Sequence, residues 1–576
     1  MKNLHDHLAF LYGEDQAPGL VQRAQQLIKD YQGRIPIRNN ELSERDSLLI
    51  TYGDQVQAPN EKPLKTLNTF CSRHLADIIE GIHILPFYPW TSDDGFSVVD
   101  YRQVDPNLGS WEDVSALQDR FRLMFDGVIN HISAESGWFK GFLQDDPRYR
   151  DYFITVTGKP DLSQVVRPRT LPLLTLFTTP SGPKQVWTTF SADQVDLNYK
   201  NPEVLFEILD VLFMYMQHGA AFIRLDAIAY LWKEIGTKCI HQPQTHEIIQ
   251  FLHTALNEAP LQVHLITETN VPHVDNISYF GDGTNEAQLV YNFALPPLTL
   301  HAFHSGNAQT LSKWAKTLKL PSNTITFFNF LASHDGIGLN PARGILSEQE
   351  IDALVYKIVE HSGLVSHKNN PDGTQSPYEM NINYFDALSD PHGNEPLELQ
   401  IDRFMAAQAI MLALLGMPGI YFHSLFGSRG WQEGVKLTGR NRTINREKCR
   451  MDRLEGELAD PDSLRAKVFS RYCALLSARR SCAAFHPHGE QAILDVHPSV
   501  FALERISPDA TSHAICFHNV SAQTLTFKTD YASGTNLLTR QPFEGPQMEL
   551  GAYQIMWIKI PALSEAEPSK ERKQVK

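Results

Sequence analysis

An apolar run at 221–228 (AFIRLDAI) contains an arginine and a carboxylate, Arg224 and Asp226. Its β-branched and aromatic residues indicate a strand buried on both faces, as in a parallel sheet. Side chains alternate along a strand, so both charges point to the same side at its C-terminal end. Burying them costs several kcal/mol unless each finds a partner. Alone, the pair fits a structural ion pair and a catalytic site equally well.

Three further apolar runs also end in ionisable side chains. Any one of these groups could be a hydrogen-bonded core residue. Their common position at C-terminal strand ends instead indicates one shared site, since barrel enzymes keep their active sites at that face. These groups are Asp126 and His131 at the end of 123–130, Glu268 at the end of 263–268, and His334 with Asp335 at the end of 324–334.

Three carboxylates without a cysteine and histidine cluster point to sugar chemistry rather than to a transition metal. In retaining glycoside chemistry, one carboxylate attacks the anomeric carbon and a second protonates the leaving oxygen. Crowding of negative charge keeps one of the carboxyl groups protonated at neutral pH, as an acid must be.

The elements that must position these groups are short apolar runs alternating with helical patterns. Such alternation predicts parallel strands, and eight of them predict a (β/α)8 barrel with two inserted subdomains and a C-terminal antiparallel β domain. The apolar stretch 405–422 imitates a membrane span, but Gly416, Pro418 and Gly419 divide it into a barrel helix and a strand. The eight strand candidates are 48–54, 81–87, 123–130, 221–228, 263–268, 289–293, 324–334 and 419–423.

Two connections are too long for ordinary loops, and both leave the C-terminal face of the barrel. The last folded segment alternates apolar and polar residues, which indicates a small β domain. The predicted parts are a helical N-terminal extension (1–45), the barrel in three pieces (46–131, 197–335 and 396–486), inserted domains at 132–196 and 336–395, the C-terminal domain (487–562) and a disordered tail (563–576).

The composition narrows the class of partner. A net charge of −15 argues against a nucleic-acid binder, although a few arginines could still hold a small anion. Six cysteines without C-x-x-C spacing read as reduced thiols, which favours the cytoplasm, and the first residues lack the pattern of a signal peptide. We therefore expect small-molecule substrates, no nucleic acid, no membrane, and a monomer or homodimer.

The motifs around Asp126 and His131, Arg224 and Asp226, Glu268, and His334 and Asp335 resemble the four signatures of the α-amylase clan (glycoside hydrolase family 13), in the same order. Phe222 stands where many amylases have glycine, as in the sucrose phosphorylase subgroup. Within that subgroup, 266–273 (ITETNVPH) and 369–379 (NNPDGTQSPYE) are most similar to glucosylglycerate phosphorylases. Further matches to the subgroup are 93–96 (DDGF), 167–169 (RPR), 186–191 (VWTTFS), 194–196 (QVD) and 445–446 (NR).

The resemblance implies a role for each matching residue. Asp226 would be the nucleophile, Glu268 the acid/base and Asp335 the stabiliser of the transition state. Arg169 and Tyr378, one from each insertion, would contact phosphate, and a guanidinium fork suits phosphate geometry. No metal or organic cofactor is implied. The glucosyl ring would rest on Phe96, with its hydroxyls held by Asp93, His131, Arg224, His334 and Arg446.

Two departures from sucrose phosphorylases concern the leaving-group side. Thr269 and Asn270 replace Val-His after the acid/base, and Glu379 replaces a glutamine after Tyr378. Both argue against fructose as the acceptor. Glu379 would also repel a glycerate carboxylate unless an arginine screens it, so neutral glycerol stays an alternative.

We therefore predict a glycosyltransferase of the phosphorylase type that cleaves 2-O-α-D-glucosylglycerate reversibly to α-D-glucose 1-phosphate and D-glycerate. Glucosylglycerol, sucrose and sucrose 6'-phosphate are alternative substrates. A hydrolase of the same clan and a catalytically silent sugar-binding protein are the other hypotheses.

Overall fold

The barrel is closed in this computed structural model, which describes residues 2–37, 39–258, 262–370 and 373–561. Its strand order, β1-β17-β13-β12-β11-β10-β4-β3, places each strand beside its neighbours in sequence, and every pairing is parallel. All eight predicted strands are confirmed. They are β1 (Leu48–Thr51), β3 (Gly81–Ile84), β4 (Arg122–Gly127), β10 (Ala220–Leu225), β11 (His264–Thr267), β12 (Leu289–Tyr291), β13 (Thr326–Asn329) and β17 (Met417–Tyr421).

Strand register brings the predicted charges together. Arg224 on β10 lies opposite Asp126 on β4 and Ile266 on β11. Because the strands are parallel, the residues that follow each of them emerge at the same rim. Asp226 and Glu268 therefore leave adjacent strands side by side.

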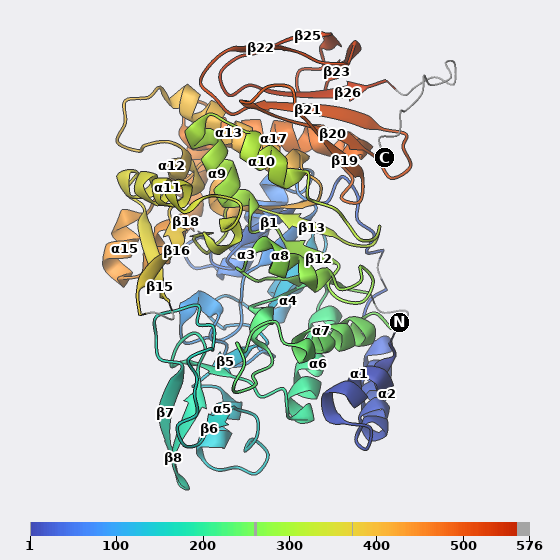
Figure 1. The fold of residues 1–576 in the computed structure, drawn as a ribbon, viewed down its shortest axis with the longest axis vertical. Coiled ribbons are helices and arrows are strands. Elements are labelled where there is room, and N and C mark those ends of the chain that lie inside the picture. The colour runs from blue at the N-terminus through green and yellow to red at the C-terminus, as the bar shows by residue number, and fades with distance from the viewer. Residues whose placement is uncertain (1, 38, 259–261, 371–372, 562–576) are drawn as a thin grey trace.

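Helices cover the outside of the barrel (Figure 1). In α6, Pro202 occupies the first turn and Asn201 caps it by accepting the Glu203 N–H, which suits a helix start. The helix α13 is buried along most of its length, which explains its membrane-like hydropathy. No helix in the described part of the chain is long and apolar enough to cross a membrane. The main helices are α3 (Pro63–His74), α4 (Trp111–Leu117), α6 (Pro202–Gln217), α7 (Pro243–Leu256), α9 (Leu295–Ser305), α10 (Gln309–Ala315), α13 (Leu397–Ala413) and α17 (Leu464–Arg480).

The first long connection folds into β sheets at one end of the molecule, opposite the C-terminal sheets (Figure 1). The second forms a three-stranded sheet, β14-β16-β15, flanked by helices. In the first connection the elements are β5 (His131–Ser133), α5 (Gly137–Leu143), β6 (Thr155–Val156), β7 (Leu174–Thr179), β8 (Gly182–Trp187) and β9 (Gln194–Asp196); in the second they are β14 (Ile337–Gly338), α11 (Glu348–Glu360), β15 (Leu364–Asn369), β16 (Gln375–Asn381) and α12 (Tyr384–Leu388).

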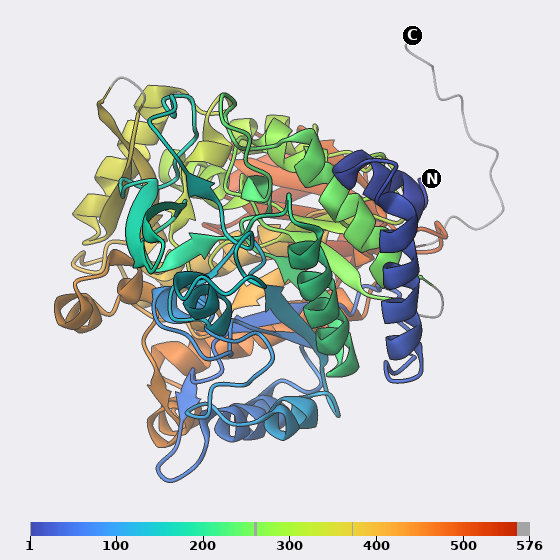
Figure 2. The ribbon, with the colours of Figure 1, turned by 90° about the horizontal axis from the view of Figure 1, so that it is seen from below.

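The two ends of the chain pack on the barrel in different ways. The helices α1 (Leu4–Tyr12) and α2 (Ala17–Gln32) lie against α6 and α7, as Figure 2 shows at the right. The predicted domain boundaries stay predictions, and the tail 563–576 lies outside the described residues. The C-terminal strands form a six-stranded and a two-stranded antiparallel sheet from β19 (Glu490–Leu494), β20 (Val500–Ile506), β21 (His513–Asn519), β22 (Leu525–Lys528), β23 (Ser533–Asn536), β24 (Pro542–Glu544), β25 (Gln547–Leu550) and β26 (Ile555–Ile560).

A buried lysine ties the first insertion to the barrel. Lys233 Nζ lies 2.6 Å from Asp196 Oδ2 on β9 and donates to Asn130 Oδ1 at 2.8 Å. Burial lowers the pKa of Lys233, whereas the Asp196 carboxylate raises it. Both side chains are almost inaccessible, so each charge depends on the other.

We expect Lys233→Met to lower the free energy of unfolding by about 3–5 kcal/mol, because it leaves Asp196 buried without its cation. Urea unfolding followed by circular dichroism would measure the loss. Lys233→Met combined with Asp196→Asn removes both charges and should recover part of it. A single variant as stable as the wild type would contradict this account.

Candidate active site

A cavity of about 90 Å³ lies at the C-terminal ends of the barrel strands, beneath the two insertions. It brings together residues from the barrel, from the first insertion and from the second. Most of the residues predicted from the sequence line it: Asp93, Phe96, His131, Arg169, Asp226, Glu268, Asn270, His334, Asp335, Tyr378 and Glu379.

Asp226 stands at the end of a chain of buried polar contacts. Arg224 donates from Nη1 to Asp226 Oδ1 at 2.9 Å and also to Asp126. Asp126 Oδ2 in turn lies 2.7 Å from His83 Nε2 on β3. Arg224 is thus held between two carboxylates, which fixes the direction in which it presents its charge to Asp226.

Glu268 accepts the backbone N–H of Ala227 at 3.0 Å. Ala227 has φ +50° and ψ +35°, a left-handed conformation that is strained for alanine. This turn directs the N–H that follows Asp226 towards Glu268. Asp93, which also lines the cavity, and its neighbour Asp94 have positive φ values as well, 55° and 50°.

Asp226 and Glu268 form a buried pair of neighbouring carboxyl groups. Burial raises the pKa of both carboxyl groups, and the charge of Asp335 raises both further. Arg224 opposes this shift, and its nitrogens lie 2.9 Å from Asp226 and 3.7 Å from Glu268. The positive charge of Arg224 is thus closer to Asp226 than to Glu268, whereas the Ala227 N–H and Arg442 favour the charged form of Glu268.

Asp335 carries a negative charge that arginines compensate. Burial opposes this charge, but Arg442, His334 and Arg446 hold the pKa of Asp335 below its usual range. Arg442 Nη1 lies 2.6 Å from Asp335 Oδ1. Burial lowers the pKa of His334 to about 3, so its ring is neutral at pH 7. That ring stacks on Phe96, with centroids 4.7 Å apart.

The two insertions close the cavity from above. Arg169 from the first insertion donates from Nη2 to Asp93 Oδ2 at 2.9 Å. Tyr378 lines the cavity from β16 in the second insertion. A Cβ on Gly338 of β14 would lie 2.6 Å from the Asn270 side chain, so only glycine leaves room for Asn270 there.

Glu379 is buried in a two-point ion pair. Arg442 donates to its two carboxylate oxygens from Nε at 2.9 Å and from Nη2 at 2.6 Å. The same guanidinium faces Asp335, so one arginine compensates two carboxylates. This is the arginine that the sequence analysis required if Glu379 was to lie near a glycerate carboxylate.

Two predicted residues do not line the cavity within the described part of the chain. Arg224 lies beneath its floor. Arg446 lines an adjoining outer cavity of about 610 Å³, where it pairs with Asp94 and donates from Nε to the His334 carbonyl at 2.8 Å. Arg224 binds Asp226, and Arg446 Nη2 lies 3.8 Å from Asp335 Oδ1, so both side chains contact residues that line the inner cavity. Their contact with sugar hydroxyls stays a prediction.

Sequence reasoning did not single out several lining residues, among them Arg442, Phe190, Gln194 and Tyr230. Phe190 and Gln194 lie in stretches already matched to the sucrose phosphorylase subgroup, which is the signal that could have identified them. Gln194 Nε2 lies 3.2 Å from both the Phe96 carbonyl and His131 Nε2. Arg442 precedes the matched residues 445–446 by only three positions, but nothing in that spacing predicts its pairing with Glu379.

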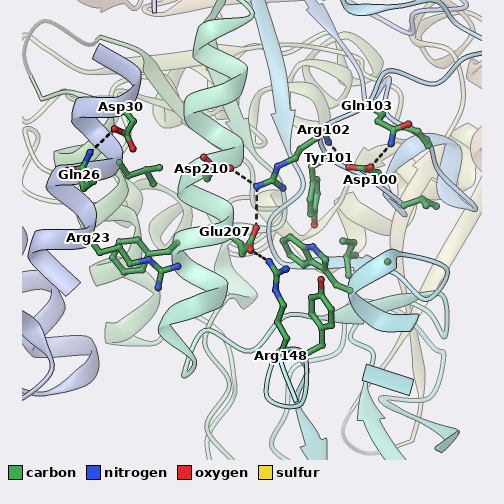
Figure 3. Close-up of a pocket in the computed structure, with 18 residues that line it drawn as sticks. Arg23, Gln26, Asp30, Asp100, Tyr101, Arg102, Gln103, Arg148, Glu207 and Asp210 are labelled. Atoms are coloured by element: carbon green, nitrogen blue, oxygen red, sulfur yellow. Dashed lines mark hydrogen bonds and ion pairs between the residues drawn. The ribbon is translucent and has the colours of Figure 1, made fainter. Parts of the chain in front are cut away.

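A larger cavity, of about 930 Å³, lies between α2, α6 and the segment that follows β3 (Figure 3). None of the residues predicted for the site lines it. Its central charges satisfy one another: Arg102 binds Glu207 at 3.2 Å and also Asp210, and Arg148 binds Glu207 at 2.7 Å. Volume alone therefore does not identify the site, and the smaller cavity has the convergent carboxylates.

Comparison with known proteins shows the family of this chain. Residues 75–339 match the family described as "Alpha amylase, catalytic domain". The chain is 50% identical to a glucosylglycerate phosphorylase of Allomeiothermus silvanus, over 97% of this chain and 98% of that one. It is 48% identical to a glucosylglycerate phosphorylase of Spirochaeta thermophila, over 96% and 98%. The solved structure of sucrose 6F-phosphate phosphorylase from Thermoanaerobacter thermosaccharolyticum aligns with a TM-score of 0.73 at 25% identity, over 87% and 98%. The chain belongs to the α-amylase family and, within it, to the group of phosphorylases that contains these relatives.

Proposed function

We propose that this protein is a retaining phosphorylase that converts 2-O-α-D-glucosylglycerate and phosphate reversibly to α-D-glucose 1-phosphate and D-glycerate. One observation carries the proposal. A cavity that brings Asp226, Glu268 and Asp335 together with an arginine from an inserted segment occurs in a chain that matches glucosylglycerate phosphorylases over nearly its whole length.

Asp226 is the nucleophile and Glu268 the acid/base. The Asp226 carboxylate attacks the anomeric carbon as the bond to the glycerate oxygen breaks, and Glu268 gives its proton to that oxygen. An oxygen of hydrogen phosphate then attacks the same carbon and the bond to Asp226 breaks, and the proton that the phosphate carried returns to Glu268. Two inversions leave the product in the α configuration.

Asp335 stabilises the positive charge that develops on the sugar ring in the transition state. Its own negative charge supports this role, since arginines lower its pKa. The glucosyl ring packs on Phe96, which His334 holds in place. The hydroxyls of the ring are held by Asp93, His131, Arg224, His334 and Arg446, and Arg224 also binds the nucleophile Asp226.

Glu379, Arg442 and Asn270 line the side of the cavity where we place the acceptor. Because Arg442 compensates Glu379, the pocket does not present a free negative charge to glycerate. This removes the repulsion that would count against glycerate, and the similarity to glucosylglycerate phosphorylases favours it over the alternatives, which are glycerol, fructose and fructose 6-phosphate. Six free cysteines, five of them buried, are consistent with a cytoplasmic location, which we also propose.

Phosphorolysis of a small panel tests the function: glucosylglycerate, glucosylglycerol, sucrose and sucrose 6'-phosphate, each with and without phosphate. We expect glucosylglycerate to have the highest kcat/KM and to yield α-glucose 1-phosphate. Release of glucose alone would make the protein a hydrolase, and no reaction with any substrate would favour a sugar-binding protein. A β-linked product would contradict the retaining mechanism, for which the two carboxyl groups should lie about 5–5.5 Å apart.

We expect kcat/KM for glucosylglycerate to fall at alkaline pH as Glu268 loses its proton. Burial and the charge of Asp335 raise the pKa of Glu268, so the loss occurs well above the pH at which an ordinary glutamate titrates, about 4.3. Below the raised pKa, Glu268 keeps the proton that the leaving oxygen needs. The pH profile with α-glucosyl fluoride, whose leaving group needs no proton, should lack most of this alkaline fall. Matching alkaline limbs for both donors would remove Glu268 as the acid.

A further inference from the structure

Two different anions use the acceptor side of this cavity in turn, if the proposed function is correct. Glycerate leaves from one face of the anomeric carbon, and phosphate later attacks from that same face, because both displacements involve Asp226 on the other side. The oxygen of glycerate and the oxygen of phosphate thus occupy one position. An anion held there in a small, largely buried space requires a cation with free hydrogen-bond donors.

Only two lysine or arginine side chains line the cavity among the described residues, Arg169 and Arg442. Arg442 is committed to protein carboxylates. Its Nε and Nη2 bind Glu379 at 2.9 Å and 2.6 Å, and its Nη1 lies 2.6 Å from Asp335. Two negative charges surround this one positive charge, so Arg442 has little attraction left for an anionic ligand.

Arg169 is in a different state. Its only described hydrogen bond to the protein runs from Nη2 to Asp93 at 2.9 Å, which leaves most of its five N–H donors available. Its side chain is 33% exposed and lines both the inner cavity and the outer cavity through which a ligand would enter. The neighbouring Thr170 carbonyl accepts from Asn369 Nδ2 at 3.5 Å, so the second insertion steadies this loop.

The family resemblance already implies that Arg169 contacts phosphate; we propose that the same arginine also binds the carboxylate of glycerate, so that one guanidinium serves both half-reactions. Its planar fork can bind either group through two parallel hydrogen bonds. Asp93, also within reach of Gln194, keeps the guanidinium turned towards the cavity between the two events. Arg169 thereby sets the preference for a negatively charged acceptor over a neutral one, and for phosphate over water.

The test uses α-glucosyl fluoride as donor, because it forms the glucosyl-enzyme without phosphate. Glycerate and glycerol then compete as acceptors, one charged and one neutral. For Arg169→Gln we expect the ratio of transfer to glycerate over transfer to glycerol to fall by about tenfold to hundredfold. The ratio of glucose 1-phosphate to glucose, at fixed phosphate, should fall by a similar factor. Arg169→Lys, which keeps the charge without the fork, should give an intermediate loss.

The matched control is Arg442→Gln combined with Glu379→Gln, which removes one charge of each sign. Formation of the glucosyl-enzyme cancels in the ratio, so a general loss of activity in this variant does not affect it. We expect its glycerate-to-glycerol ratio to stay close to that of the wild type. A selective loss of glycerate in the control with none in Arg169→Gln would assign the receptor to Arg442 and overturn the proposal. Equal loss of both acceptors in Arg169→Gln would also overturn it while leaving the proposed function intact, whereas a wild type that ignores glycerate would overturn both.

Discussion

Asp226→Asn is expected to lower the rate of phosphorolysis by about 10⁴-fold or more, because an amide cannot form the covalent glucosyl-enzyme. The fold should persist. The amide oxygen of the variant side chain would still accept the Arg224 N–H that is now 2.9 Å from Asp226, and Asp126 would keep the arginine paired. Initial rates with glucosylglycerate and phosphate measure the loss.

The mass of the intact protein after reaction with α-glucosyl fluoride shows whether a covalent glucosyl-enzyme forms, and whether it still forms when Asp226 is replaced. Wild type should gain the mass of a glucosyl group, and Asp226→Asn should not. Asp126→Asn is the matched control, since it removes the other carboxylate that Arg224 binds and should still form the intermediate, more slowly. A glucosylated Asp226→Asn protein would assign the nucleophile to another residue.

The barrel could be predicted because its strands are buried on both faces. Such strands read as short continuous apolar runs, and each of the eight runs coincides with a barrel strand. The common location of Asp226, Glu268 and Asp335 could then be predicted as well, since the C-terminal ends of parallel strands meet at one rim of the barrel. Strand register, which places Arg224 opposite Asp126, then explains why the two charges tolerate burial.

Contacts between loops could not be predicted in the same way. Glu379 and Arg442 are 63 residues apart, on a strand of the second insertion and after the last barrel strand. No periodic pattern records such a pair, because it depends on how two irregular segments fold over the cavity. The sequence could state only the requirement, that a buried glutamate beside an anionic acceptor needs an arginine.

The strained backbone at Ala227 also could not be predicted from the sequence. Ala227 adopts a left-handed conformation that normally favours glycine or asparagine, so its residue type predicts an ordinary backbone. The conformation is maintained by the contacts around it, including the hydrogen bond from its N–H to Glu268. We infer that the cavity fixes this strain to orient the acid/base.

Glu268→Gln is expected to lower phosphorolysis of glucosylglycerate by about 10²- to 10⁴-fold, because the leaving oxygen no longer receives a proton. The glutamine oxygen can still accept the Ala227 N–H, so the loop should stay in place. With α-glucosyl fluoride, formation of the glucosyl-enzyme should be nearly normal, since fluoride leaves without a proton. Phosphate is already an anion and needs no base to attack, so glucose 1-phosphate should still form from the fluoride.

Neutral nucleophiles should behave differently in the same variant. Water and glycerol must lose a proton as they attack, and Glu268 is the group placed to accept it. With α-glucosyl fluoride, Glu268→Gln should therefore transfer glucose to phosphate at a far higher share than the wild type does, at equal phosphate concentration. The measurement is the ratio of glucose 1-phosphate to glucose released. If the variant lost activity equally with glucosylglycerate and the fluoride, and kept the wild-type product ratio, Glu268 would have only a structural role and the acid/base would have to be sought among the other groups that line the cavity.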